Sequence, residues 1–330
     1  MNETASKAFD LVAVGGWTIF DHIFRVERVP EVGETVTVSS SIEEIDRTFW
    51  GGCAPNNAVA AARLGFRTAL IMVAGRDFAE RGYRPYLEQA GVALQGVHVF
   101  SDGLSGHSFL FCDPEGNSVC ISHIGVSERQ EDIAPDPRPL RQARAAILNY
   151  RFDRFTLAAG AIGRASGAQI VTSGDLNTSS MPEQFVAIAD VLIANQFELE
   201  RLAEKLGGRG IGGLLNLGPS AIVATSGARG AVVLTPGGEE FVSPARARQV
   251  VDPIGAGDAF AGSTAAAYGR GIPLPFAARI GAVTASFVVE ARGCQTNLPT
   301  WDLMAERYHE TFREEPPAPT LLAAQNTLPA

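Results

Sequence analysis

The sequence predicts a doubly wound α/β domain, with a mostly parallel sheet flanked by helices and a small β-sheet lid. Two observations lead to this prediction. Apolar runs that read as buried strands alternate with helical segments over most of the 330 residues, which is typical of parallel βαβ units. A group of short strands without helices interrupts this alternation, which indicates an insertion beside the main sheet. In such folds the ligand crevice lies at the carboxyl ends of the strands.

The N-terminal part of the chain begins the main sheet. A buried strand at Asp10–Gly16 ends in two glycines, and Thr68–Ala74 is a second apolar strand. Helices at Cys53–Leu64 and Glu80–Gln89 are each followed by a glycine within two residues, which is a common C-terminal stop. This strand–helix–strand–helix order predicts parallel pairing.

Short strands and an early segment are expected to form the lid. Their residues alternate between polar and apolar or are separated by a turn at 113–117, which is typical of half-buried antiparallel strands. We expect the lid to comprise about residues 17–48 and 97–126. Its strands are predicted at Ile19–Val26, Glu34–Ser41, Val97–Phe100, His107–Cys112 and Ser118–Ser122.

The alternation of strands and helices returns after the lid. Four further buried strands are predicted at Ala145–Asn149, Ala168–Thr172, Val191–Ile193 and Ala221–Thr225, and closing helices at Ala256–Arg270, Phe276–Ala291 and Leu303–Phe312. The chain from Glu314 onward is rich in Pro and Ala, a composition that favours a loose terminus. We therefore expect one domain over residues 1–315 and a flexible tail over 316–330.

Composition excludes several classes of function. The net charge of −9 argues against a nucleic-acid polymer as partner. The four cysteines have no CxxC spacing, so we expect free thiols rather than a structural zinc site. Residues 1–10 lack an apolar signal core, and no apolar run is long enough to cross a membrane. These features predict a cytoplasmic protein without membrane contact.

The run Val250–Phe260 carries the strongest chemical signal. It contains Gly255, Ala256, Gly257 and Asp258 immediately before a helix rich in small residues. A glycine turn and a helix start leave backbone N–H groups free to bind an anion. A carboxylate in that place could accept a proton from a hydroxyl while the N–H groups stabilise a transferring phosphoryl group. The alternative interpretation of Asp258 is a helix cap behind a glycine turn.

A second glycine turn, Gly51–Gly52, leads into a helix that carries Asn56. The Asn56 amide offers both a donor and an acceptor, which suits sugar hydroxyls. Asp21 follows the first strand, and its carboxylate could accept hydrogen bonds from two hydroxyls. Each residue also has a plainer interpretation, as a helix start for Asn56 and as a solvated loop residue for Asp21.

Two later motifs follow buried strands. Asn195 and Glu198 share one helix face, where their oxygens could face a hydrated Mg²⁺; a capping box explains the same spacing. Thr225, Gly227 and Gly230 could lie flat against a nucleotide or form a simple turn. The sequence has no GxxxxGK[ST], no GxGxxG after the first strand and no GxSxG, which argues against P-loop enzymes, dehydrogenases and α/β-hydrolases.

Taken together, the motifs resemble the ribokinase-like (PfkB) carbohydrate kinase family over about residues 10–312. Asp252–Asp258 is similar to the family's D-[TP]-x-G-A-G-D signature, Gly51-Gly52 with Asn56 to its N-terminal glycine signature, and Asn195 with Glu198 to its NxxE motif. The segment 285–302 resembles the microbial nucleoside kinases of the family.

This resemblance implies phosphoryl transfer from ATP to a hydroxymethyl group of a sugar or of a nucleoside ribose. It implies that Asp258 is the general base and that the N–H groups of Gly255, Ala256 and Gly257 form the anion hole. The acceptor would contact Asp21, Gly51, Gly52 and Asn56. ATP would contact Asn195, Thr225, Gly227 and Gly230, with Mg²⁺ organised indirectly by Glu198. A monovalent cation such as K⁺ would lie near Asp252, Gly293 and Asn297.

The identity of the acceptor stays open between a free sugar and a nucleoside. Cys53-Ala54-Pro55 differs from the Lys-Gly-Ala of many ribokinases, whereas 148–155 and 173–177 depart from the nucleoside-kinase pattern. A nucleoside would need an apolar wall for its base, and Trp17, Phe109 and Phe111 could form it or could be the core of the lid. A non-catalytic sugar- or nucleotide-binding protein of the same fold is the alternative function. Unpaired strand edges of the lid favour a homodimer.

Overall fold

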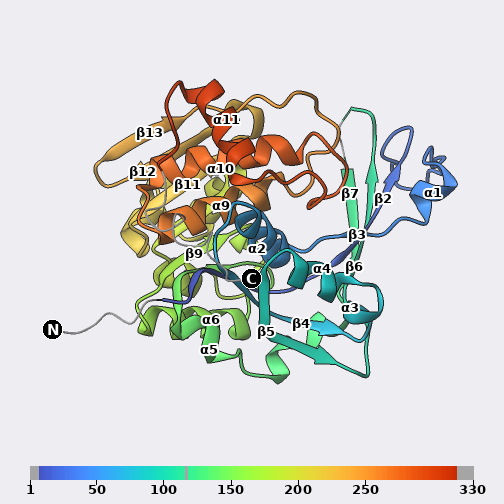
Figure 1. Ribbon diagram of the computed structural model, residues 1–330, viewed down its shortest axis with the longest axis horizontal. Coiled ribbons are helices and arrows are strands. Elements are labelled where there is room, and N and C mark those ends of the chain that lie inside the picture. The colour runs from blue at the N-terminus through green and yellow to red at the C-terminus, as the bar shows by residue number, and fades with distance from the viewer. Residues whose placement is uncertain (1–6, 116–117, 318–330) are drawn as a thin grey trace, which may run out of the picture.

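A computed structural model describes residues 7–115 and 118–317. Its centre is a nine-stranded sheet in the order β13-β12-β11-β10-β9-β8-β1-β4-β5, parallel except for β12 and β13 (Figure 1). The strands are β1 (Phe9–Val14), β4 (Thr68–Gly75), β5 (Val92–Phe100), β8 (Ala143–Leu148), β9 (Gln169–Ser173), β10 (Val191–Asn195), β11 (Ala221–Thr225), β12 (Ala231–Thr235) and β13 (Gly238–Val242). The strand order reverses between β1 and β8, and such a switch point marks the ligand crevice of doubly wound sheets.

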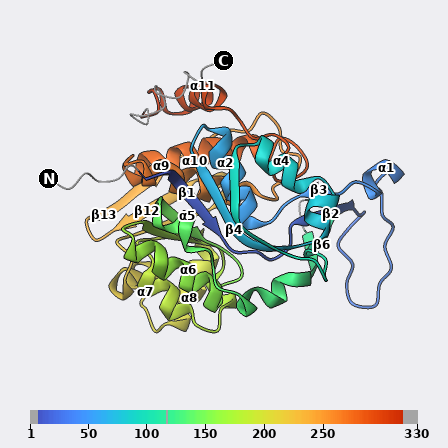
Figure 2. The ribbon, with the colours of Figure 1, turned by 60° about the horizontal axis from the view of Figure 1, so that its bottom comes forward.

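Helices cover both faces of this sheet (Figure 2). One face packs against α2 (Cys53–Arg63), α3 (Asp77–Glu80), α4 (Tyr83–Gln89), α9 (Ala256–Gly269) and α10 (Leu274–Val288), with α11 (Trp301–Phe312) outside them. The other face packs against α5 (Pro137–Arg141), α6 (Arg154–Ala165), α7 (Pro182–Ile188) and α8 (Gln196–Lys205). The sheet therefore separates two hydrophobic cores, as the predicted fold class requires.

The apolar strands and the small-residue helices explain this packing. All eight residues of β4 are buried, because a parallel strand is covered on both faces and is therefore apolar along its whole length. Helix α9 lies very close to α2, since a Cβ at Gly262 would overlap the backbone of Asn57. This close approach fixes the N-terminal ends of α2 and α9 relative to each other.

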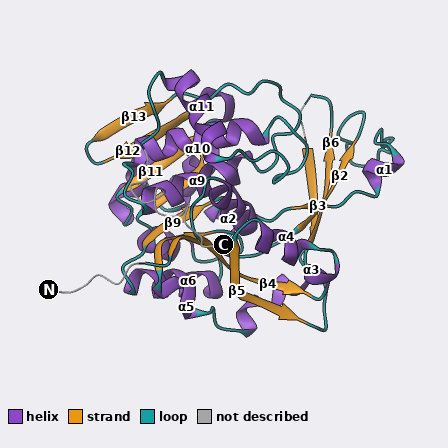
Figure 3. Cartoon of the chain, in the orientation of Figure 1, coloured by secondary structure: helices purple, strands orange, loops and turns teal. Residues whose placement is uncertain are grey.

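A smaller sheet stands beside the main body (Figures 1 and 3). Its order is β3-β2-β6-β7, formed by β2 (Phe20–Arg25), β3 (Phe49–Trp50), β6 (His107–Cys112) and β7 (Ser118–His123), with β2 and β6 parallel. A short helix, α1 (Ile42–Ile45), lies in the connection between β2 and β3. We call these four strands the lid sheet; they confirm that a small sheet accompanies the main one.

Several predicted elements differ from the structure. Glu34–Ser41 is not a strand: the segment makes one isolated bridge, between Val38 and Val26, and alternation alone cannot form a strand without a partner. Val97–Phe100 is the end of β5 in the main sheet and not part of the lid. The helix predicted over 80–89 is divided at Gly82, whose φ of +79° breaks the helical conformation.

Three further predictions concern the cysteines, membrane-spanning helices and the C-terminal tail. All four cysteines, Cys53, Cys112, Cys120 and Cys294, are free. Within residues 7–115 and 118–317, no helix combines the length and hydropathy that crossing a bilayer requires. Most of the predicted tail, residues 318–330, lies outside the described residues.

Candidate active site

The glycine turn before α9 adopts the conformation that its sequence predicts. Gly255 precedes the helix with a φ of +82°, and a Cβ there would lie 2.5 Å from the Cβ of Cys294. An added Cβ at Gly257 would meet no atom within 4 Å, so the helix start faces open space. The Ala256 N–H already donates to Pro253 O over a long 3.3 Å. A helix start of this kind leaves N–H groups that suit an anion.

Asp258 lies at this helix start and is held from α2. Its Oδ2 accepts a hydrogen bond of 2.8 Å from Asn56 Nδ2, while Asn57 Nδ2 donates to its backbone oxygen, also at 2.8 Å. Burial raises the pKa of Asp258, and hydrogen bonds from Asn56 and Cys53 oppose this shift. The Asp258 side chain is thus held toward α2, in a residue that stays partly exposed.

Asn56 is itself oriented by residues that the sequence reading did not single out. Gln295 Nε2 donates to Asn56 Oδ1 at 2.7 Å and to the Tyr83 hydroxyl at 2.7 Å. Tyr83 donates in turn to the backbone oxygen of Gly51 at 2.7 Å. This buried network connects both glycine turns to α4, and it fixes which end of the Asn56 amide faces Asp258. The signal for Gln295 was its position in the segment that resembles nucleoside kinases.

Asp21 is not a solvated loop residue, because it lies in β2 with 6% of its surface exposed. Cys294 Sγ lies 3.7 Å from its Oδ2 and donates to it, and a Cβ at Gly51 would overlap that carboxylate. Burial raises the pKa of Asp21 to about 7, against the hydrogen bond from Cys294 and with a further rise from the charge of Asp258. Cys294 also lies against Gly255, so Asp21 on the lid sheet lies close to the glycine turn that carries Asp258.

Gly52 begins α2 with a φ of +92°, a conformation that favours glycine, and an added Cβ would lie 2.7 Å from Thr18 O. The chain just before β2 thus lies directly against the glycine turn. The residues predicted to contact the acceptor therefore lie together at the start of α2: Asp21, Gly51, Gly52 and Asn56.

The predicted cation residues are only partly brought together. Asp252 is buried and accepts the N–H groups of Ile254 at 3.0 Å and of Gly293 at 3.3 Å. The Asn297 side-chain nitrogen instead donates to Phe287 O at 2.7 Å. Asp252 and Gly293 thus form one contact, and the Asn297 amide stabilises the neighbouring helix end.

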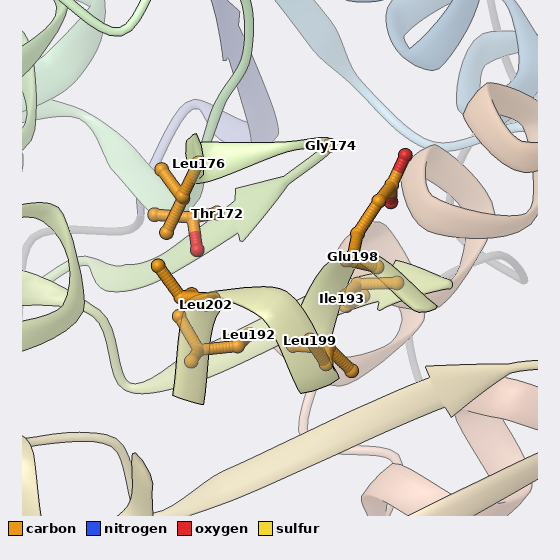
Figure 4. A pocket seen from close by; sticks show the side chains of 9 residues that line it. Thr172, Gly174, Leu176, Leu192, Ile193, Glu198, Leu199 and Leu202 are labelled. Carbon is orange, nitrogen blue, oxygen red and sulfur yellow. The ribbon is translucent and has the colours of Figure 1, made fainter. Parts of the chain in front are cut away.

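Asn195 and Glu198 form a capping box at the start of α8. Asn195 Oδ1 accepts the Glu198 N–H at 2.9 Å, and Glu198 Oε2 accepts the Asn195 N–H at 3.0 Å. Burial raises the pKa of Glu198, the Asn195 N–H opposes this, and the charge of Asp175 raises it further. Figure 4 shows the Glu198 carboxylate pointing away from the leucines that line a small cavity below it. Capping uses one carboxylate oxygen and leaves the other for a ligand.

The turn after β11 lies beside this capping box. Thr225 is in register with Asn195, and its hydroxyl donates to Ala194 O at 3.3 Å. An added Cβ at Gly227 would meet nothing within 4 Å, whereas Gly230 has a φ of +93° and approaches the Val242 backbone. The two motifs predicted to contact ATP therefore lie side by side, after the carboxyl ends of the neighbouring strands β10 and β11.

Two of the three aromatic residues considered for a nucleobase wall, Phe109 and Phe111, face away from the acceptor residue Asp21. In the lid sheet Asp21 pairs with Ser108, whereas Phe109 pairs with His22 and stacks on it at 5.0 Å. Because side chains alternate along a strand, Phe109 and Phe111 lie on the opposite face from Asp21. The face on the side of Asp21 instead presents an apolar group formed by Ile23, Phe49, Leu110 and Ile254. Trp17 contacts the Arg151 guanidinium at 5.8 Å.

Comparison with known proteins gives a consistent picture. The family described as pfkB family carbohydrate kinase matches residues 10–301. A nucleoside kinase of Methanothermobacter thermautotrophicus is 31% identical over 316 residues, which cover 94% of this chain and 99% of that protein. A nucleoside kinase of Methanocaldococcus jannaschii is 30% identical over 297 residues, with 88% and 94% covered.

Solved structures agree. The crystal structure of the Methanocaldococcus jannaschii nucleoside kinase is similar with a TM-score of 0.82 and 28% identity, covering 93% of this chain and 100% of that one. A Burkholderia thailandensis nucleoside kinase in complex with inosine has a TM-score of 0.82 at 21% identity, covering 93% and 99%, and shows the same fold.

Proposed function

This chain belongs to the pfkB family of carbohydrate kinases, and from that premise we propose that it phosphorylates the ribose hydroxymethyl group of a nucleoside. It is a sugar or nucleoside kinase that uses ATP as co-substrate. The observation that carries the proposal is the meeting of Asp21 and Asp258, one from the lid sheet and one from the glycine turn. One carboxylate would hold the sugar, and the other would receive its proton.

Two features favour a nucleoside over a free sugar. The curated relatives described above, which span nearly the whole chain, are nucleoside kinases. The face of the lid sheet on the side of Asp21 is apolar, with Ile23 and Leu110 buried against Phe49 and Ile254. An apolar surface beside the acceptor residues suits a nucleobase better than the hydroxyls of a sugar.

The proposed reaction requires little covalent chemistry from the protein. Asp258, held by Asn56, would accept the proton of the hydroxymethyl group as the oxygen attacks phosphorus. The N–H groups of Gly255, Ala256 and Gly257 would stabilise the negative charge on the transferring phosphoryl group. Asp21 and the two glycines Gly51 and Gly52 would position the ribose. Positioning and charge stabilisation then account for most of the rate enhancement.

We include Mg²⁺ in the proposal, organised with the phosphates by Glu198. Asp175 is close enough to Glu198 for its charge to raise the pKa of the Glu198 carboxyl group. One or two carboxylates together with phosphates and water suit this ion, although the described residues include no group of three or more His, Cys, Asp or Glu side chains placed to bind a metal. Bound Mg²⁺ would neutralise charge on the phosphates of ATP.

We also include a monovalent cation, K⁺, beside Asp252. The hydrogen bonds that hold this buried carboxylate come from the neutral backbone amides of Ile254 and Gly293. A buried charge is costly without compensation, so a cation beside this loop would be stabilised. Through Gly255, the same loop leads into the anion-binding turn.

The lid sheet would close over the acceptor and exclude water. We propose further that two copies associate through it. Its edge strand β7 is exposed along its whole length, with Val119 and Ile121 exposed by 39% and 59%, and exposed strand edges favour pairing. The reaction would take place in the cytoplasm, where ATP is supplied and free thiols remain reduced.

The decisive experiment measures ADP release with inosine, adenosine, cytidine, ribose, fructose and 2-keto-3-deoxygluconate as acceptors. We expect turnover with at least one nucleoside, abolished by EDTA. Asp258→Asn should lower kcat by about 10²–10⁴-fold, while ADP and nucleoside binding persist. Turnover with the free sugars alone would refute the proposed acceptor, and near-normal kcat in the variant would remove Asp258 from the role of base.

A further inference from the structure

Tyr150 occupies the switch point of the main sheet, although no motif pointed to it. It follows β8 by two residues, next to the end of β1, where the strand order reverses. Gly15 at the end of β1 has a φ of +119°, and a Cβ there would lie 2.5 Å from Tyr150 O. The backbone of Tyr150 is thus held at the place where doubly wound sheets bind ligands.

A second glycine holds the ring of Tyr150. A Cβ on Gly174 would lie 2.6 Å from Tyr150 Cε2, so the phenol lies directly against the backbone that follows β9. The hydroxyl oxygen accepts the Asp175 N–H at 2.7 Å. A phenol that accepts one hydrogen bond can still donate its own proton, and no acceptor within the described residues takes it.

Hydrogen bonds connect the partner of this hydroxyl to the capping box, because Asn177 Nδ2 donates to Asp175 Oδ1 and, at 2.9 Å, to Glu198 O. Burial raises the pKa of Tyr150, the Asp175 N–H opposes this shift, and proximity to the ionisable side chains of Cys53, Glu198 and Asp175 raises the pKa further. Cys53 is a hydrogen-bond partner of Asp258, whereas Glu198 belongs to the capping box. The hydroxyl therefore remains a neutral donor, close to the capping box and to Cys53.

We propose that the Tyr150 hydroxyl donates a hydrogen bond to a phosphate oxygen of bound ATP, on the path from Glu198 to Asp258. This inference rests on the proposed function. The Asp175 N–H fixes the orientation of the hydroxyl before ATP binds, and a preorganised donor stabilises phosphate charge without reorganisation. Tyr150 is thus a phosphate-binding residue in a segment, 148–155, that departs from the nucleoside-kinase pattern.

Tyr150→Phe tests this directly, because the ring and its packing on Gly174 remain. Calorimetric titration should show ADP binding weakened by about tenfold or more, as expected for loss of a hydrogen bond to a charged group. The Kd for inosine and the melting temperature should change little. Tyr268→Phe, on α9 at the far end of the helix from Asp258, is the matched control and should bind ADP like the parent protein.

Unchanged ADP affinity in Tyr150→Phe would overturn the inference. Equal loss of ADP and inosine binding with a lower melting temperature would also overturn it, since it would identify Tyr150 as a structural anchor. If the parent protein binds ADP but phosphorylates no nucleoside, the proposed acceptor fails, and the ADP titrations still decide the role of Tyr150.

Discussion

Replacing Asp21 with Asn should make the protein more stable at pH 8, although it removes an acceptor-binding group. The carboxyl group is buried, and its pKa is raised from its ordinary value of 3.8 to about 7. Between these two values the folded protein keeps the proton while the unfolded chain releases it. Stability therefore falls as pH rises through this interval, and the full cost is present above about pH 7.

The size of the effect follows from the same two pKa values. The interval from 3.8 to about 7 corresponds to an upper limit of about 4 kcal/mol at pH 8. Much of that cost is absent at pH 5, so the difference in the free energy of unfolding between Asp21→Asn and the parent should grow by about 2–3 kcal/mol from pH 5 to pH 8. An amide has no charge to desolvate, and it can still accept from the Cys294 thiol.

Urea unfolding at pH 5, 6, 7 and 8 measures this difference by linear extrapolation. A difference that does not change with pH would refute the reasoning, whatever its absolute size. Asp258→Asn provides a second check, because the Asp258 charge contributes to the raised pKa of Asp21. In an Asp258→Asn background the pKa of Asp21 should be raised less. The difference in the free energy of unfolding caused by Asp21→Asn should therefore change over a narrower pH interval.

Three further predictions address other parts of the site. Gly51→Ala places a Cβ on the Asp21 carboxylate and should lower kcat/KM for the acceptor by about 10²-fold through misplacement, with KM for ATP nearly unchanged; an unchanged kcat/KM for the acceptor would contradict it. Glu198→Gln keeps a capping acceptor for the Asn195 N–H, so the free energy of unfolding should stay within about 0.5 kcal/mol, whereas the Mg²⁺ concentration for half-maximal rate should rise by about tenfold or more. A normal Mg²⁺ response would show that Glu198 only caps the helix. Ile121→Lys should convert a dimer to a monomer in light scattering, and a parent protein that is already monomeric would refute association through the lid sheet.

Local patterns in the sequence were sufficient to place much of this molecule. Buried strands such as Thr68–Ala74 need covered faces and are therefore apolar throughout, so they were recognisable without any structure. The Asn195–Glu198 spacing allowed a capping box as the alternative to a pair facing Mg²⁺, because i and i+3 residues adjoin on a helix, and the structure contains the capping box. The turn before Asp258 was equally recognisable, since Gly255 adopts a backbone conformation that other residues rarely take.

Pairing between distant segments could not be predicted in the same way. Glu34–Ser41 has the alternation of a strand but no continuous partner beyond one bridge. Phe109 was a candidate for the nucleobase wall until the register of β2 with β6 placed it on the face opposite Asp21. Register depends on which strands meet in space, and one residue of shift exchanges the two faces.

The sequence by itself determined the alternating α/β architecture, the glycine turn at Asp258 and its helix, because each depends on residues near one another in the chain. Only the tertiary structure decided that Asn56 orients Asp258, that Asp21 is buried against Gly51 and Cys294, and that Tyr150 packs against Gly15 and Gly174. These relations join segments as much as 273 residues apart, and their energies come from burial and hydrogen bonding that exist only once the sheet and the lid sheet are assembled.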